Sequence, residues 1–126
     1  MILSANSVSP TALIYRSVHI ARDSFDVRCD RQTPWGNPFP MNNKTEEERT
    51  RVIRQYRYWL WGEIQNKDGA TRLLRPLIKA KNENGGTLRL GCWCAPKPCH
   101  CDVLGRACEW LERNDNKLRE NSQHEQ

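Results

Sequence analysis

Long apolar segments are absent from this sequence, and no run approaches the roughly 20 residues that a membrane-spanning helix needs. The first residues, Met1 to Ser4, lack the basic and hydrophobic stretches of a secretory signal, so we expect a cytoplasmic protein without a membrane partner. No internal repeat is visible, which excludes solenoid and propeller folds. Apolar residues make up only 37% of the 126 residues, which still suffices for one small globular domain.

Charge is unevenly distributed along the chain. Lys and Arg number 20 against 15 Asp and Glu, which gives a net charge of +5. The segment 114–126 holds more acidic than basic residues and one aliphatic side chain, so we expect a disordered polar tail there and a flexible arm over 1–10. The predicted domain, 11–113, carries the positive charge, which suits nucleotides, nucleic acid or an acidic protein surface.

Three segments are typical of β-strands. Residues 11–20 and 25–29 are rich in β-branched and aromatic side chains, and 87–92 follows the breaker Asn-Gly-Gly at 84–86. Helical periodicity lies between and after them. The resulting order of strands and helices predicts an α/β fold, with a small mixed or parallel sheet flanked by helices in a single compact domain.

Helix boundaries are marked by specific residues. Thr45 and Glu48 have the spacing of a capping box, which predicts a helix that begins after Thr45 and ends near Gly62. A weaker helix around 73–78 is interrupted by Pro76. Asp102 is expected to cap a last helix with an apolar face over 103–111.

Six cysteines are present, and four of them lie within the ten residues 92–101. A disulfide scaffold would spread its cysteines, so a tight cluster in a reducing compartment indicates metal or thiol chemistry. Zinc takes four thiolate or imidazole ligands, and a Zn²⁺ cofactor is one interpretation. Its candidate ligands are Cys92, Cys94, Cys99 and His100, or Cys101 in place of His100.

Two other interpretations of this loop stay open. Amide groups at the start of the last helix attract phosphate and lower the pKa of a nearby thiol, and Lys97 and His100 add cationic character. Any catalysis would then use Cys94 or Cys99 together with His100. Alternatively the thiols simply pack in the core, which is the interpretation we favour for Cys29 and Cys108.

A second unusual loop, 31–40, contains three prolines and two large aromatic residues. Trp35 could stack on a nucleobase while Asn37 hydrogen-bonds to the edge of that base, or both residues could close one end of the sheet. Arg31 could bind a phosphate. Both this loop and 92–101 follow predicted strands, so we expect them to meet at one end of the sheet. The arginines at positions 49, 51, 54 and 57 are expected on the exposed side of the first long helix, either on phosphates or in salt bridges.

Two segments together resemble a known family. The segment 31–39, RQTPWGNPF, is similar to the signature GR-x-(S/T)-x-WGNPF, and 90–104, LGCWCAPKPCHCDVL, is similar to LGCWCAP-x-PCHGDVL. Both signatures are typical of the domain of unknown function 4326 (DUF4326), common in bacteriophages and their hosts. The resemblance implies a compact α/β domain and a phage-related setting, hence the host cytoplasm, and brings no reaction with it. Asp30 and Cys101 depart from the family pattern, which has a small residue at each position.

Two functions are compatible with these observations. The first is a pocket that binds a nucleotide-like or phosphorylated ligand, with Asn37 in its wall. Arg31, Lys97 and His100 would bind the phosphate, and Trp35 and Trp93 would stack on the base. The alternative is a structural-zinc domain that docks a host macromolecule, either nucleic acid or an inhibited host protein. The residue patterns do not decide whether the protein is an enzyme.

Overall fold

Three short parallel strands form the sheet of this protein. The computed structural model describes residues 14–124, with side chains as far as residue 115. The strands are β1 (Tyr15–His19), β2 (Val27–Arg28) and β3 (Leu88–Cys92), in the order β1-β3-β2, and both outer strands run parallel to β3. The predicted α/β sheet is confirmed and is of the parallel kind. The first two strands are shorter than predicted, and 11–13 lie outside the described residues.

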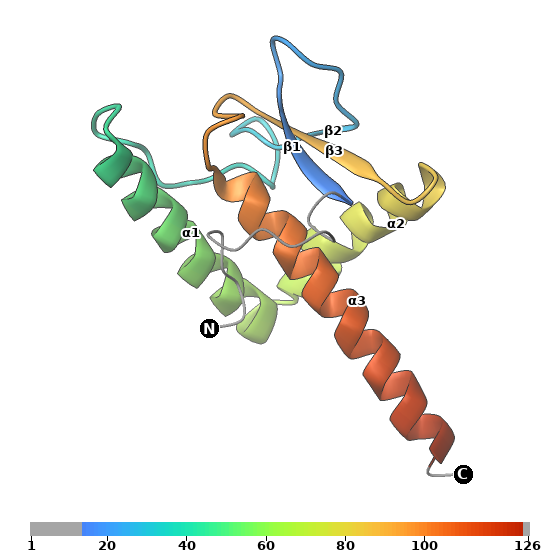
Figure 1. Ribbon diagram of the computed structural model, residues 1–126. Coiled ribbons are helices and arrows are strands. Elements are labelled where there is room, and N and C mark those ends of the chain that lie inside the picture. Colours follow the sequence, from blue (N-terminus) through green and yellow to red (C-terminus); the bar gives the residue numbers. More distant parts are fainter. Residues whose placement is uncertain (1–13, 125–126) are drawn as a thin grey trace.

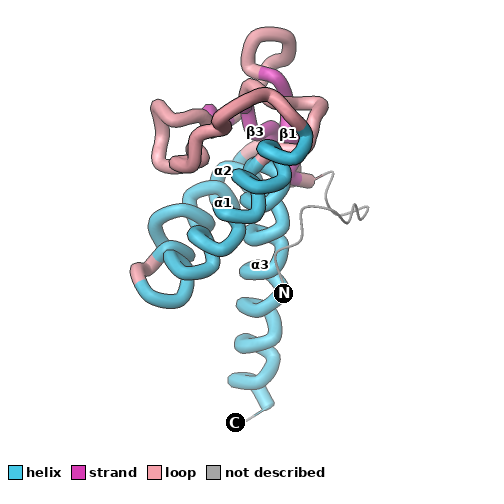
Figure 2. Tube along the Cα trace, turned by 90° about the vertical axis from the view of Figure 1, so that its left-hand side faces the viewer, coloured by secondary structure: helices cyan, strands magenta, loops and turns pink. Residues whose placement is uncertain are grey.

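Three helices accompany the sheet. They are α1 (Glu46–Asn66), α2 (Arg75–Glu83) and α3 (His100–His124), and a π-helical turn, η2 (Ala70–Leu74), leads into α2. Of these, α2 and α3 contact the strands of the sheet, and α1 packs on α3. Figure 1 shows α3 running between α1 and α2, and α3 contacts both of them as well as β1 and β3. Because parallel strands need long connections, α1, η2 and α2 together form the crossover from β2 to β3. The tube view in Figure 2 shows the last turns of α3 extending beyond the rest of the fold.

The N-terminus of α1 confirms the predicted cap. The hydroxyl of Thr45 accepts a hydrogen bond from the backbone N–H of Glu48 at 3.2 Å. The Glu48 carboxylate does not reach back to Thr45, as a full capping box requires, but accepts from the backbone of Asn42 and pairs with Arg51. Only one of the two hydrogen bonds of the predicted capping box is therefore present at this helix start.

The C-terminus of α1 lies beyond its predicted end at Gly62. The helix continues to Asn66, because a single glycine with open space around it is tolerated inside a helix. The chain leaves the helical conformation at Lys67, and the next residue, Asp68, has a left-handed φ of 57°. Gly69 follows at a point where a Cβ atom would lie 2.6 Å from the Glu63 carbonyl carbon. The close approach at Gly69 marks the real break.

Helix α3 begins at His100, two residues before the predicted cap Asp102. The Asp102 carboxylate accepts from the backbone N–H of Cys99 at 3.0 Å, so it caps the helix from within the first turn. Its other oxygen accepts from the Ser17 hydroxyl at 2.7 Å. Asp102 thereby fixes the start of α3 against β1.

At its other end α3 continues to His124, through residues 114–124, where the sequence predicts a disordered tail. No glycine or proline follows Gly105 to end the helix, and Asp115 pairs with Arg75 of α2 at 2.9 Å. The predicted arm, 1–10, lies outside the described residues. Within the part of the chain that the structure describes, no helix is long and apolar enough to cross a membrane.

The core lies between the sheet and the three helices. Side chains from all of these elements meet there, and Cys29 and Cys108 are buried among them, as predicted for packing residues. The largest members with no exposed surface are Tyr56, Leu60, Leu74, Leu90 and Leu104. This single core agrees with one compact domain.

A buried polar cluster lies at the amino end of β1. Tyr15 donates its hydroxyl to Glu112 of α3 at 2.5 Å, and the Lys81 ammonium of α2 donates to the other oxygen of Glu112 at 2.6 Å. Lys81 is only 8% exposed. Each charge in this cluster has a partner, so it ties β1, α2 and α3 together.

Candidate functional site

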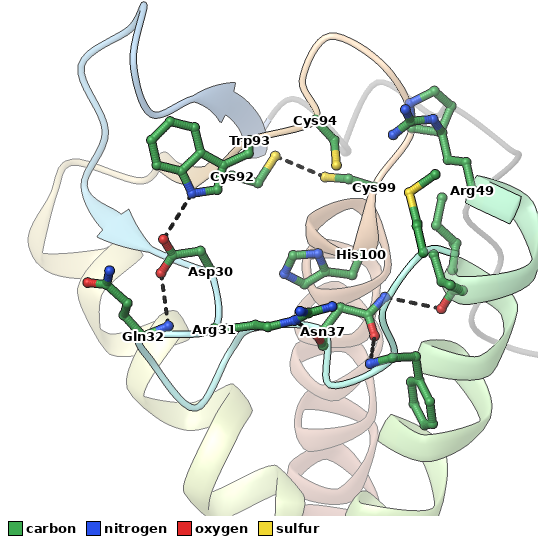
Figure 3. Close-up of a pocket in the computed structure, with 15 residues that line it drawn as sticks. Asp30, Arg31, Gln32, Asn37, Arg49, Cys92, Trp93, Cys94, Cys99 and His100 are labelled. Carbon is green, nitrogen blue, oxygen red and sulfur yellow. Dashed lines mark hydrogen bonds between the residues drawn. The ribbon is translucent and has the colours of Figure 1, made fainter. Parts of the chain in front are cut away.

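The two unusual loops meet at the carboxyl ends of the strands, as predicted. They enclose, with the start of α1, a pocket of about 400 Å³, which we call the loop pocket (Figure 3). In an open parallel sheet this is the position where ligands bind. Its lining residues are Asp30, Arg31, Gln32, Asn37, Phe39, Met41, Arg49, Val52, Ile53, Cys92, Trp93, Cys94, Pro98, Cys99 and His100.

The structure brings together most of the predicted ligand-binding residues. Arg31, Asn37, Trp93 and His100 all line the loop pocket. Lys97 is exposed and lies outside the lining, although its backbone N–H bonds to Cys94 within the same loop. The predicted role of Lys97 as a phosphate contact therefore has no support in this geometry.

Trp35 is also outside the lining, which corrects its predicted role in stacking. Its indole N–H donates to the carbonyl of Leu73 at 2.8 Å, and its ring packs against the core. That carbonyl belongs to η2, where Arg75 bonds to Ala70 in the wider π pattern. Trp35 thus packs against the core and donates a hydrogen bond to a backbone carbonyl of the irregular helix η2.

Asn37 and Arg31 hold the 31–40 loop in place. The Asn37 amide donates to the carbonyl of Val52 in α1 at 3.1 Å and accepts from the N–H of Phe39 at 2.9 Å. The Arg31 Nε donates to the carbonyl of Asn37 at 3.1 Å. These bonds set the wall of the loop pocket. Arg31 also brings a mostly exposed cation to its rim.

Trp93 is the most exposed aromatic side chain on the wall, at 54%. Its indole N–H donates to Asp30 at 3.0 Å, which joins the two loops, and its ring meets His19 edge-on at 5.8 Å between centroids. Arg28 pairs with the same Asp30 carboxylate at 2.7 Å and holds its pKa well below the usual range. A ring fixed by its edge leaves its faces for stacking.

His100 is buried at the wall of the loop pocket. Its Nε2 lies 2.6 Å from the carbonyl of Cys29, so this nitrogen carries a proton. Burial lowers the pKa of the imidazole, which disfavours the cation, and Tyr56 packs edge-on against the ring at 5.0 Å. The burial of His100 therefore argues against the phosphate-binding cation that the sequence predicts.

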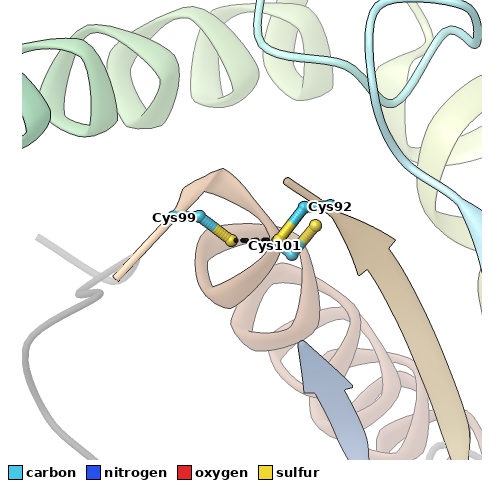
Figure 4. Close-up of side chains that lie close together, drawn as sticks. All are labelled: Cys92, Cys99 and Cys101. Carbon is cyan, nitrogen blue, oxygen red and sulfur yellow. Dashed lines mark hydrogen bonds between the residues drawn. The ribbon is translucent and has the colours of Figure 1, made fainter. Parts of the chain in front are cut away.

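Three thiols form a cluster that could hold a metal ion. The Sγ atoms of Cys92, Cys99 and Cys101 all lie within 4.8 Å of one another, and all three side chains are buried (Figure 4). Of the predicted zinc ligands, Cys92 and Cys99 belong to this group, and so does Cys101, the predicted alternative to His100. Cys94 and His100 do not belong to it. Thiolate is a preferred zinc ligand, so the donor set fits such an ion.

Among these thiols Cys92 has the strongest thiolate character. Hydrogen bonds from Cys101 and then Cys99 hold the pKa of Cys92 far below its usual value, and the N–H groups of Cys94 and Ala95 add to this. Cys99 lies 3.1 Å from it, Sγ to Sγ. The predicted catalytic candidates were Cys94, Cys99 and His100, so the thiol with the lowest pKa is one that the sequence assigned only to metal binding.

Arg49 is the lining residue that the sequence analysis placed wrongly. It is 8% exposed and lines the loop pocket, in contrast to the predicted exposed position. Its Nε and Nη1 atoms have no hydrogen-bond partner among the described residues, and its nearest carboxylate, on the exposed Glu46, is 3.8 Å away. The spacing to Val52, Ile53 and Tyr56, at i+3, i+4 and i+7, would have placed it on the apolar face of α1.

The comparisons with known proteins agree with this arrangement of motifs. Residues 14–110 match the family described as a domain of unknown function (DUF4326). An Enterobacteria phage T4 protein described as "Uncharacterized 12.4 kDa protein in nrdA-td intergenic region" is 32% identical over 108 residues, which cover 85% of this chain and 89% of the phage protein. No solved structure matches the chain. The resemblance drawn from the two loop motifs is thus confirmed, and the chain belongs to the DUF4326 family.

Proposed function

We propose that the protein binds a phosphorylated, nucleotide-like ligand in the loop pocket. The observation that carries this proposal is Arg49, a buried guanidinium whose Nε and Nη1 lack hydrogen-bond partners among the described residues. Its ion pair with the exposed Glu46 is long, at 3.8 Å, and leaves these two nitrogens without a hydrogen bond. Buried polar atoms without hydrogen bonds are costly, and an anionic group in the pocket would compensate them. Arginine is also the residue best suited to phosphate.

The rest of the pocket suits the other half of such a ligand. Val52, Ile53 and Phe39 give the wall an apolar surface, and the exposed ring of Trp93 offers a face to a nucleobase. Arg31 supplies a second cation at the rim. A volume of about 400 Å³ lies within the range typical of small-molecule sites.

Calorimetric titration with inorganic phosphate and a series of nucleoside monophosphates tests the proposal. We expect at least one nucleotide to bind, and Arg49→Met to weaken it by about 10- to 100-fold, since a hydrogen bond to a charged group contributes about 1.5–3 kcal/mol. Arg54→Met is the matched control, because Arg54 is exposed on the same helix. Absence of binding by every probe, or unchanged affinity in Arg49→Met, contradicts the proposal.

A further variant separates the two halves of the ligand. Trp93→Ala should weaken nucleotide binding by about 1–3 kcal/mol, the usual contribution of one stacked base, and should leave the affinity for inorganic phosphate unchanged. Equal losses for both probes would mean that Trp93 supports the pocket without stacking on a base.

The thiol cluster favours a second candidate, a structural-zinc domain that docks a host macromolecule. Tyr58, 55% exposed, and its neighbour Arg57 lie on α1 near Arg54 and would belong to such a surface. In this case Cys92→Ser should unfold the domain, because metal binding energy is then folding energy. Arg54→Glu should weaken docking in a salt-dependent way if the macromolecule is nucleic acid, which a fluorescence anisotropy titration with a labelled oligonucleotide measures.

A further inference from the structure

The number of thiols in the cluster bears on what a bound metal could do. Structural zinc sites are closed by four protein ligands, whereas catalytic zinc sites have three and leave the fourth position to water or substrate. Within the described part of the chain, the atoms that lie mutually within 4.8 Å are those of three cysteines, Cys92, Cys99 and Cys101. The cluster therefore has the ligand count of an open site.

The neighbouring groups that could serve as a fourth ligand each have another hydrogen-bond partner. The Nε2 of His100 lies 3.9 Å from the Cys101 sulfur but bonds to the Cys29 carbonyl at 2.6 Å. The Cys29 thiol interacts with Cys101 and also donates to the Val27 carbonyl at 3.7 Å. Both oxygens of Asp102 accept hydrogen bonds, one from Ser17 and one from the N–H of Cys99. Each of these groups would have to give up its present partner before it could close the site.

The position of the cluster determines where the fourth coordination position points. Cys92 ends β3 and Cys99 precedes α3, and both line the loop pocket, whereas Cys101 lies in the first turn of α3 and outside the lining (Figures 3 and 4). An ion bound by the three sulfurs would thus lie at the pocket wall. Cys101 would bind the ion from the side that faces away from the pocket. Arg49 lines the same pocket.

We propose that Cys92, Cys99 and Cys101 bind a zinc-class divalent ion whose fourth position is open to the loop pocket. The ion would there accept an oxygen or nitrogen atom of the bound molecule, or a water, as a Lewis acid. The identity of that molecule rests on the proposed function, whereas the open position does not. The Ser17 hydroxyl, 3.9 Å from the Cys99 sulfur, and the N–H groups near Cys92 would support the ligands from outside.

Cobalt substitution tests this inference. Protein purified without chelator and under reducing conditions is loaded with Co²⁺, whose visible spectrum reports tetrahedral geometry and sulfur coordination. We expect one Co²⁺ per chain and a change of the visible bands on addition of azide, a small anion able to reach an open position. Cys101→Ser should lose the metal. Cys94→Ser and Cys108→Ser should keep it, the latter being the matched control because Cys108 is a buried thiol of α3 outside the cluster.

Every other result decides against the open site. No stoichiometric Co²⁺ or Zn²⁺ in the wild-type chain overturns it, as does a bound metal whose spectrum azide leaves unchanged. Loss of the metal in Cys29→Ser or Cys94→Ser, with the fold intact by circular dichroism, identifies a closed four-ligand site. The wild-type readings need no variant, so an unfolded Cys101→Ser chain does not obscure the answer. An azide response without nucleotide binding contradicts only the proposed function, and nucleotide binding without metal contradicts only this inference.

Discussion

Two positively charged side chains are buried among the described residues, and they differ in how their charge is satisfied. At the amino end of β1, Lys81 and Tyr15 share the two oxygens of Glu112. At the carboxyl end of the sheet, Arg49 is equally buried but has two nitrogens without a hydrogen-bond partner among the described residues. In the first arrangement every charge has a hydrogen-bonded partner, whereas in the second the proposed ligand would supply the missing one. The difference separates a structural charge from one that is available to a ligand.

The largest effect should come from breaking the satisfied cluster. Glu112→Ala would leave the Lys81 ammonium and the Tyr15 hydroxyl buried without their shared acceptor. We expect a loss of about 2 kcal/mol in the free energy of unfolding, below the ~3–5 kcal/mol of fully buried pairs because the Glu112 side chain is 31% exposed. Urea unfolding measures it. Glu83→Ala, in an exposed pair with Lys79, is the control and should change stability little. A similar loss in both variants would show that burial does not matter here.

Stability should respond in the opposite sense at Arg49. Replacing it by methionine removes a buried cation with two nitrogens lacking hydrogen bonds and only a long ion pair to the exposed Glu46, and it keeps most of the side-chain volume. We therefore expect stability to be unchanged or raised by about 1 kcal/mol. Urea unfolding of the ligand-free protein in phosphate-free buffer measures this. A loss of 2 kcal/mol or more would show that Arg49 is a structural charge, and the contrast with Lys81 would fail.

A third experiment asks how far the 31–40 loop is structural. Trp35→Phe keeps an aromatic ring but leaves the Leu73 carbonyl without the indole N–H. We expect a loss of about 1 kcal/mol, the usual contribution of such a hydrogen bond, and unchanged nucleotide affinity. Thermal unfolding and calorimetry provide the two values. Weakened binding at unchanged stability would restore the stacking role to Trp35.

The smallest effect concerns the start of α1, next to Arg49. The Arg51 guanidinium lowers the pKa of Glu48 from its ordinary value to about 2. A depressed carboxyl pKa stabilises the fold above the unfolded pKa near 4.5, and this contribution is lost as the pH falls from there toward 2. Glu48→Gln should therefore flatten the acid side of the stability profile between these values, as followed by urea unfolding at several pH values. An unchanged profile would mean that solvent screens this partly buried pair.

Much of the fold could be predicted from local patterns. The alternation of strands and helices, the cap at Thr45 and the meeting of the two loops follow from short-range rules, because each depends on neighbouring residues or on the general geometry of parallel sheets. The prediction that α1 ends near Gly62 was wrong because Gly62 has open space around it, whereas a Cβ atom at Gly69 would clash with the backbone of Glu63. That contact is tertiary and leaves no mark in the local pattern.

The candidate site was only partly predictable, for a similar reason. Its two loops and most of its residues were found, but the bonds that commit Trp35 to Leu73 and Asn37 to Val52 span 38 and 15 residues. Which three of the cysteines converge depends on how the first turn of α3 faces the end of β3. Arg49 is different, since its helical spacing to Val52 was available in the sequence and was outweighed by its charge.

The central position of β3 has a consequence for how the chain is made. Both β1 and β2 form their ladders with β3, which comes last in sequence. Residues 15–28 can therefore acquire their strand partners only after residue 92 has emerged from the ribosome, and long-range parallel pairing of this kind is intrinsically slow. The loop pocket, built at the ends of these strands, would be completed only after β3 and the start of α3 have been made. A nascent chain that stops before β3 would have neither sheet nor pocket.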